Sequence, residues 1–168
     1  MEKLYYRNAQ FEDMEQIVAI YNTTIASRMV TADTEPVKTV DRIQWFEQHT
    51  IGLRPLIVVE NTENAMVGWM SFQSFYGRPA YKHTAEISIY LEETQRGKGL
   101  GKQILQYGID HASQYEITTL LGFIFSHNIP SLHLFYSLEF EDWGLLPNVA
   151  VLDGVERSLT IVGRKIVP

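Results

Sequence analysis

The sequence contains the run Gln95-Arg96-Gly97-Lys98-Gly99-Leu100-Gly101, in which glycine occupies every second position from Gly97 on. The preceding stretch Thr84–Leu91 alternates apolar and polar residues and predicts a β-strand, whereas apolar residues from Leu100 to Ala112 recur at helical spacing. A helix N-terminus presents unpaired N–H groups and a positive dipole end, and glycine allows an anion to approach the backbone closely. This strand–loop–helix junction therefore predicts a local site for a diphosphate.

Two other glycine patterns do not match the run. If Gly101-Lys102 were the glycine–lysine pair of a triphosphate-binding loop, Arg96 would stand where that loop needs glycine and Gln103 where it needs Ser or Thr. A dinucleotide fingerprint that begins at Gly97 meets Lys102 at its third glycine. Neither a nucleoside triphosphate nor a dinucleotide is therefore the expected ligand.

Composition limits the class of protein. The chain has 168 residues, 45% hydrophobic and 20% charged, which predicts a single domain over residues 1–168. It has no cysteine, so we expect a cytoplasmic protein without disulfides. A net charge of -6 argues against nucleic acid as a partner, and no apolar run is long enough to predict a signal peptide or a membrane span.

Periodicity and turn residues predict an alternation of strands and helices along the whole chain. Thr39 is expected to cap the second helix and Asn128 the last one, with turns near Pro147-Asn148 and at Asp153-Gly154. The order predicts an α+β or mixed α/β fold. Strands are expected at Leu4–Arg7, Leu56–Glu60, Met66–Phe75, Thr84–Leu91, Thr118–Phe125, Asp142–Leu152 and Val155–Ile166, and helices at Met14–Tyr21, Val40–His49, Leu100–Ala112 and after Asn128.

The pattern Arg96-x-x-Gly99-x-Gly101, between a strand and a helix, resembles the phosphate loop of the GNAT superfamily of CoA-dependent N-acetyltransferases. A later asparagine that begins a helix is also typical of that superfamily, and Asn128 matches it. The resemblance extends over almost the whole chain to the phosphinothricin acetyltransferase-like subfamily. It is carried by Ile20-Tyr21-Asn22, Trp45-Phe46, Gly77-Arg78-Pro79 and Thr84-Ala85-Glu86.

The resemblance implies a mostly antiparallel, twisted central sheet flanked by helices, and an enzyme that uses acetyl-CoA. It also implies a homodimer. The acceptor that it implies is the primary amine of a small amino acid or an analogue such as phosphinothricin or methionine sulfoximine. Cofactor contacts are implied at Ile89, Tyr90, Leu91, Arg96, Gly97, Lys98, Gly99, Leu100, Gly101, Lys102 and Asn128, and substrate contacts at Arg78, Pro79, Ala80, Glu86, Ile87 and Ser88.

An amine acceptor needs a base, because an aliphatic amine with a pKa of about 10.4 is mostly protonated at neutral pH. Only the free base attacks a thioester, and a carboxylate that accepts the proton accelerates the reaction roughly a hundredfold or more. Glu86, on its predicted strand, is our candidate for this base. Asp33, Glu35 and Asp41 are alternatives.

Arg78 lies in a turn-rich segment where its guanidinium could hold an acceptor carboxylate, and Arg28 is a second candidate. Many GNAT enzymes have a tyrosine acid on the helix after the asparagine, but here Phe135 matches that place and Tyr136 follows it, so no acid is assigned. The histidine spacing predicts no metal site. Acetylation of a protein N-terminus, a lysine or a polyamine, and acyl-CoA sensing without catalysis, remain alternatives.

Overall fold

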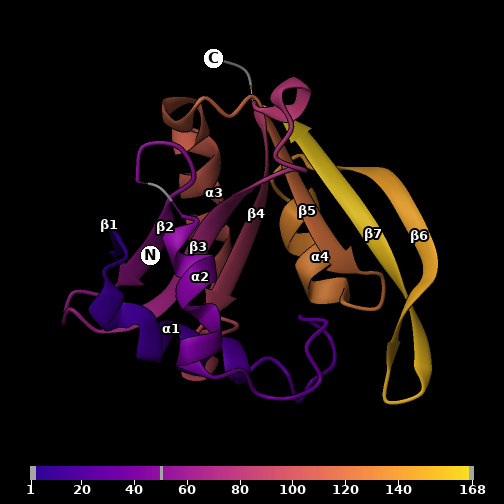
Figure 1. The fold of residues 1–168 in the computed structure, drawn as a ribbon, viewed down its shortest axis with the longest axis horizontal. Coiled ribbons are helices and arrows are strands. Elements are labelled where there is room, and N and C mark those ends of the chain that lie inside the picture. Colours follow the sequence, from indigo (N-terminus) through magenta and orange to yellow (C-terminus); the bar gives the residue numbers. More distant parts are fainter. Residues whose placement is uncertain (1–2, 50, 167–168) are drawn as a thin grey trace.

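A seven-stranded sheet organises the fold, with strand order β1-β2-β3-β4-β5-β7-β6 (Figure 1). The computed structural model describes residues 3–49 and 51–166. Neighbouring strands are antiparallel except β4 and β5, which are parallel, so the predicted mixed α/β fold with a mostly antiparallel sheet is confirmed. The strands are β1 (Tyr5–Asn8), β2 (Leu56–Glu60), β3 (Met66–Ser74), β4 (Thr84–Leu91), β5 (Thr119–Phe125), β6 (Glu141–Leu152) and β7 (Val155–Lys165).

Helices connect the strands and cover the sheet. The predicted helix over Val40–His49 is wrong in extent, because Thr39 begins a separate 3-10 turn and the α-helix starts only after Arg42. Across residues 3–49 and 51–166, no helix is long and apolar enough to span a membrane. The helices are α1 (Met14–Asn22), α2 (Ile43–Glu47), α3 (Leu100–His111) and α4 (Ile129–Tyr136), with 3-10 turns η1 (Phe11–Asp13), η2 (Thr39–Arg42), η3 (Pro79–Tyr81), η4 (Glu93–Gln95) and η5 (Ala112–Tyr115).

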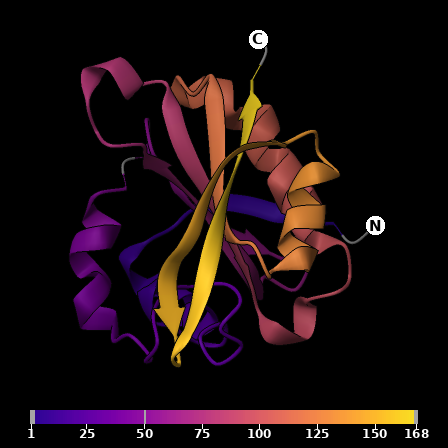
Figure 2. The same cartoon turned by 90° about the vertical axis from the view of Figure 1, so that its right-hand side faces the viewer.

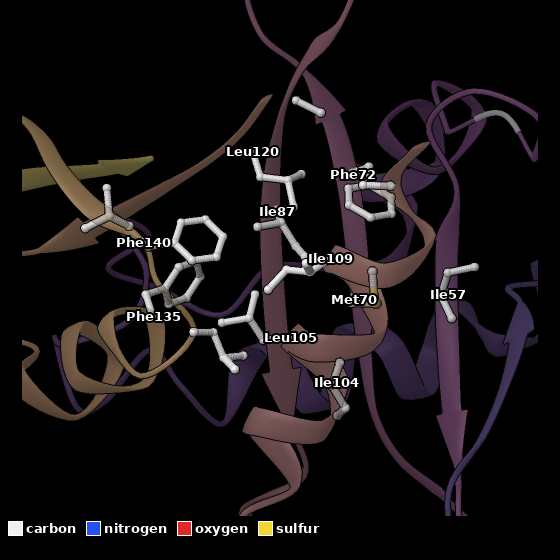
Figure 3. Close-up of a cluster of buried hydrophobic side chains, with 14 of the residues drawn as sticks. Ile57, Met70, Phe72, Ile87, Ile104, Leu105, Ile109, Leu120, Phe135 and Phe140 are labelled. Carbon is white, nitrogen blue, oxygen red and sulfur yellow. The ribbon is translucent and has the colours of Figure 1, made fainter. Parts of the chain in front are cut away.

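The alternation of side chains in the strands gives the sheet two apolar faces. On β2, Ile57 belongs to the larger core with α3, whereas Val58 packs on the other face against α1. Figure 3 shows Ile87 and Met70 of the larger core beside side chains of α3. α3 lies so close to the sheet that a Cβ on Gly108 would be 2.5 Å from Ile87 Cδ1. This close packing fixes the position of α3, and hence of the glycine run at its start.

β4 and β5 pair over only three positions before they separate. The register joins Thr84–Glu86 to Thr119–Leu121, and no further pair between these strands occurs in the described chain. Beyond Glu86, the stretch Ile87–Leu91 keeps β3 as a neighbour and has no partner on the β5 side. An unpaired strand edge offers N–H and C=O groups to a ligand.

The hairpin of β6 and β7 extends away from the helices (Figure 1) and crosses the front of the molecule in Figure 2. Its predicted turn at Asp153-Gly154 is confirmed, with a positive φ at both residues. The turn expected near Pro147-Asn148 is wrong, because β6 continues through it with a register shift between Leu146 and Ala150. β6 is paired with β7 both before and after this irregularity, so β6 forms a bulge there and does not reverse its direction.

Candidate active site

Two cavities meet at β4 and share Ser88 and Tyr90. The first, which we call the α1-side cavity, has a volume of about 140 Å³ and lies between α1, the start of α2, β3 and β4. The second, the β4–β5 groove, has a volume of about 220 Å³ and lies where β4 and β5 separate, beside the starts of α3 and α4. A molecule in one cavity therefore lies next to a molecule in the other.

Four aromatic side chains line the α1-side cavity: Tyr21, Trp45, Trp69 and Tyr90. The rings of Trp69 and Tyr90 stack with centroids 4.3 Å apart, and Trp45 meets Trp69 edge-on at 5.7 Å. Burial raises the pKa of Tyr90 above its ordinary value, so its phenol stays neutral. Such an aromatic lining favours a bound molecule that carries an apolar or sulfur-containing group of moderate size.

Glu86 contributes the only carboxylate among the residues lining this cavity, within the part of the chain that the structure describes. The two-residue period of β4 places it on the same side as Ser88 and Tyr90, as the sequence predicts. Burial raises the pKa of Glu86 above 4.5, and a hydrogen bond from Ser88 Oγ to Glu86 Oε1, 3.2 Å long, opposes this shift. A raised pKa makes the ionised carboxylate a stronger proton acceptor.

The other acids considered as bases occupy different surroundings. Asp33 Oδ2 accepts hydrogen bonds from the Tyr21 hydroxyl and from Arg42 Nη2, the latter at 2.6 Å. Glu35 and Asp41 are exposed and line neither cavity. Glu86 therefore has the surroundings best suited to the role of base.

Arg42 is a candidate that the sequence did not single out. It lines the α1-side cavity from the junction of η2 and α2, and its guanidinium carbon lies 4.8 Å from the centre of the Tyr21 ring. Trp45 and Trp69, to which the sequence assigns no role in the site, also line this cavity. A signal was present, since Arg42 and Trp45 are three residues apart on a predicted helix and so share a face.

The β4–β5 groove contains most of the backbone and apolar groups expected to hold a cofactor. Ile89, Tyr90 and Leu91 line it, and so do Ile87 and Ser88, which were expected to contact the acceptor. Opposite them, Gly122–Ile124 of β5 and side chains of α4 form the other wall. The groove thus combines an unpaired strand edge with apolar walls, as a long, partly apolar chain with amide groups requires.

The glycine run closes the groove at the N-terminus of α3. Gly97 has φ 74° and Gly99 has φ 80°, values that favour glycine, and Gly99 is the residue immediately before the helix. Arg96 lines the groove, donating from Nε to Leu91 O at 3.2 Å and from Nη2 to Thr23 Oγ1 at 2.6 Å. The unpaired N–H groups of the helix start and this guanidinium together suit a diphosphate.

The other residues of the glycine run and Lys102 surround the N-terminus of α3 and the Arg96 guanidinium. Lys98 Nζ donates to Gln95 Oε1 at 3.1 Å and is exposed, as is Lys102. Leu100 is buried in the core, so only its backbone can face a ligand. Gly101 lines the groove, where a Cβ would be 3.3 Å from Leu134 Cδ2 of α4.

Asn128 has the capping role that the sequence predicts. Its Oδ1 accepts a hydrogen bond from Ser131 N at 3.2 Å at the start of α4, and its Nδ2 donates to Met29 O at 3.0 Å. His127 Nε2 lies 2.8 Å from Arg28 O. Asn128 lines the groove, so it joins the groove to the segment between α1 and η2.

The structure places Arg78, Pro79 and Ala80 in an exposed segment that lines neither cavity. Arg28 is also outside both linings, and its Nε donates to Asp153 Oδ2 at 2.8 Å. The predicted acceptor contacts are therefore not all brought together: Glu86 and Ser88 line the α1-side cavity, and Ile87 lines only the β4–β5 groove. Residues 78–80 line neither.

The helix after Asn128 brings Phe135, rather than a tyrosine, to the groove. Tyr136 points elsewhere, because its hydroxyl donates to Asp142 Oδ1 at 2.6 Å, and this bond raises the pKa of Tyr136 to about 12. Glu139, three residues after the end of α4, has φ 62°. The chain therefore leaves the helix through a left-handed residue, a position at which glycine is the usual choice.

A family profile and individual known proteins that resemble this chain point to the same family. The profile of the acetyltransferase (GNAT) family matches residues 14–140. A Bacillus subtilis protein with the provisional name phosphinothricin acetyltransferase YwnH is 52% identical over 160 residues, which cover 95% of this chain and 98% of that protein.

Two further proteins resemble the chain over nearly its whole length. The L-methionine sulfoximine/L-methionine sulfone acetyltransferase of Pseudomonas paraeruginosa is 30% identical over 93% of this chain and 91% of its own. The solved structure of YncA from Salmonella typhimurium, with its cofactor acetyl-CoA, superposes with a TM-score of 0.88 at 27% identity, covering 98% of this chain and 94% of that one.

Proposed function

This chain belongs to the GNAT family of acetyl-CoA-dependent acetyltransferases, and we propose that its acceptor is the primary amine of a small amino acid or amino-acid analogue. One observation carries the proposal: a half-buried carboxylate, Glu86, lines an aromatic cavity that meets the β4–β5 groove at Ser88 and Tyr90. Relatives named for methionine sulfoximine, methionine sulfone and phosphinothricin support this class of acceptor.

Acetyl-CoA supplies the acetyl group as a thioester, and the β4–β5 groove fits it. We assign its diphosphate to the backbone N–H groups of Gly97–Gly101, to Arg96 and to the ammonium of Lys102, whose own backbone N–H donates to Gly99 O. The helix start and the positive φ of two glycines support this assignment. The backbone edge of Ile89–Leu91 is assigned to the amides of the pantetheine arm, since it has no partner on the β5 side. Asn128 completes this set from the start of α4.

Glu86 is proposed to accept a proton from the acceptor ammonium, directly or through a water molecule, so that a free amine attacks the thioester carbonyl. A backbone N–H at the unpaired edge of β4 would donate to the oxygen on which negative charge develops. Ser88 is placed to hold Glu86 through its hydrogen bond. The leaving thiol has a reference pKa of about 8.5, so it can depart as a thiolate without a strong acid.

Three further expectations belong to this proposal. A homodimer agrees with the exposed apolar side chains on β6, the edge strand of the sheet, which include Leu145, Val149 and Val151 at 57–62% exposure. A cytoplasmic location rests on the absence of cysteine from the sequence. The acetyltransferase domain is expected to span residues 1–168.

A thiol-release screen tests the proposed acceptor. Purified protein and acetyl-CoA are mixed with free amino acids, methionine sulfone, methionine sulfoximine and phosphinothricin, and in parallel with polyamines and a peptide with a free N-terminus. We expect the highest kcat/KM with the amino-acid analogues. A higher kcat/KM for the polyamine or the peptide would show that this amine, and not an amino acid, is the preferred acceptor. Binding of acetyl-CoA without release of its CoA thiol in the presence of any amine would indicate a sensor.

A further inference from the structure

The α1-side cavity contains one side chain with a permanent positive charge. Among its lining residues in the described chain, Arg42 is the only lysine or arginine, and Glu86 is the only acid. The two groups come from different parts of the fold, Arg42 from the end of η2 and Glu86 from the middle of β4. A cavity that contains one group of each sign is complementary to a zwitterion.

The guanidinium of Arg42 has donors left for a ligand. Its Nη2 donates to Asp33 Oδ2, whereas Nε and Nη1 make no hydrogen bond within residues 3–49 and 51–166. The side chain is 27% exposed. Since a guanidinium carries five N–H donors in a fixed plane, the bond to Asp33 orients the group and leaves others for a carboxylate.

The surrounding contacts hold Arg42 in place. Asp33 Oδ2 also accepts from the hydroxyl of Tyr21, whose ring lies against the guanidinium at 4.8 Å. Tyr21 in turn contacts Tyr90, with ring centroids 5.2 Å apart. The arginine is therefore oriented by an ion pair and an aromatic face before any ligand arrives, and this reduces the entropy that binding would cost.

We infer that Arg42 is a specificity-determining residue that binds the carboxylate of the amino-acid acceptor, while the amine of the acceptor lies toward Glu86 and its side chain lies along the aromatic lining. The inference deepens the proposed function and rests on it. It gives Arg42 the role for which Arg78 was the first candidate from the sequence; Arg78 lies outside both cavities. Arg28 is already paired with Asp153.

A pair of acceptors and a pair of variants test this role. The acceptors are methionine sulfone and its carboxamide, which differ in the charge of one group, and kcat/KM is compared at equal concentrations of free base. The variants are Arg42→Gln and, for the rival residue, Arg78→Gln. A charge-assisted bidentate contact corresponds to a change of about 30-fold in binding.

We expect Arg42→Gln to lower kcat/KM for methionine sulfone about 30-fold, mainly through KM, with a change of about threefold or less for the carboxamide. Arg42→Lys should restore part of the loss, because it keeps the charge without the planar fork. Equal losses for both acceptors would indicate a structural role and overturn the inference. If Arg78→Gln, and not Arg42→Gln, selectively lowers kcat/KM for methionine sulfone, the carboxylate is bound by Arg78.

The wild-type protein provides a measurement that does not depend on the folding of a variant. We expect it to prefer the acid over the carboxamide by about 30-fold in kcat/KM. Equal use of the two acceptors overturns the role of Arg42 but leaves the acetyltransferase active. If acetyl-CoA releases no CoA thiol with either acceptor or with other amino acids, the proposed acceptor class itself is contradicted, so the two failures are distinguishable.

Discussion

Replacing Glu86 with glutamine removes the proposed base while keeping nearly the same volume. The carboxylate is half-buried in the α1-side cavity, where Ser88 Oγ donates a hydrogen bond to it, and a glutamine oxygen can accept the same bond. The change therefore alters proton transfer with little effect on packing. For an acceptor amine, loss of a positioned base lowers the rate by about 10²–10⁴-fold at neutral pH, or about 3–5 kcal/mol of activation free energy.

The pH dependence distinguishes a lost base from a damaged cavity. Burial raises the pKa of Glu86 above 4.5, so wild-type kcat/KM should rise as the pH passes through this raised value, and then level off. The variant has no base to deprotonate the acceptor, so it reacts only with acceptor molecules whose amine is already deprotonated in solution. Its kcat/KM should therefore rise about tenfold per pH unit toward the pKa of the amine, and the ratio of wild type to variant should shrink accordingly.

Stability gives an independent control for this variant. The folded state of the wild type binds the Glu86 proton more tightly than the unfolded state does, so stability is lost as the pH rises through the raised pKa. Glutamine carries no charge to bury, and Glu86→Gln should unfold at a higher temperature than wild type at pH 7.5. The reasoning is refuted by wild-type turnover at neutral pH, or by a fixed activity ratio across the pH range.

Three more predictions concern other parts of the chain. Arg96→Ala should raise the Kd for CoA about 10-fold or more, measured by titration calorimetry, because a charge-assisted phosphate contact is lost. The Kd of the variant should also depend less on salt concentration than the Kd of the wild type. An unchanged Kd would exclude Arg96 from the site. Glu139 has a left-handed backbone, so Glu139→Gly should be more stable than Glu139→Ala by about 1 kcal/mol in urea unfolding. Both variants lose the ion pair to Arg164, so the comparison isolates the backbone. The reverse order of stability would argue against a positive φ. Sedimentation equilibrium should give twice the 19.3 kDa chain mass for the wild type and a lower average for Val151→Glu, whereas a monomeric wild type would contradict the β6 dimer.

Local patterns predicted the elements that depend on short-range chemistry. The cap at Asn128 and the hairpin turn at Asp153-Gly154 depend on residues within a few positions of one another, and both occur as expected. The strand Thr84–Leu91 has the expected bounds, because its alternation matches two different surroundings, the core and the α1-side cavity. These features require no knowledge of the rest of the fold.

Features that depend on distant residues were not predictable in this way. Arg42 becomes part of the site through its ion pair with Asp33 and its contact with Tyr21, and it lies where the predicted helix over 40–49 is interrupted. Trp69 belongs to the smaller core cluster and also lines the α1-side cavity, because α1 and α2 come from other parts of the chain to form its walls. The loop at Arg78 is turn-rich, as expected, but no local pattern states which way such a loop lies relative to a cavity.

The separation of β4 and β5 has a consequence for motion. The sheet consists of two blocks, β1–β4 and β5–β7–β6, joined by the three register pairs from Thr84 to Glu86, and α3 packs beside this junction. A rotation of one block about these pairs would move a residue of β4 relative to β5 in proportion to its distance from them. Glu86 pairs with Leu121 in the last of them, which places the carboxylate beside the pivot. Such a rotation would therefore change the position of Glu86 relative to the two blocks less than that of Ile89–Leu91.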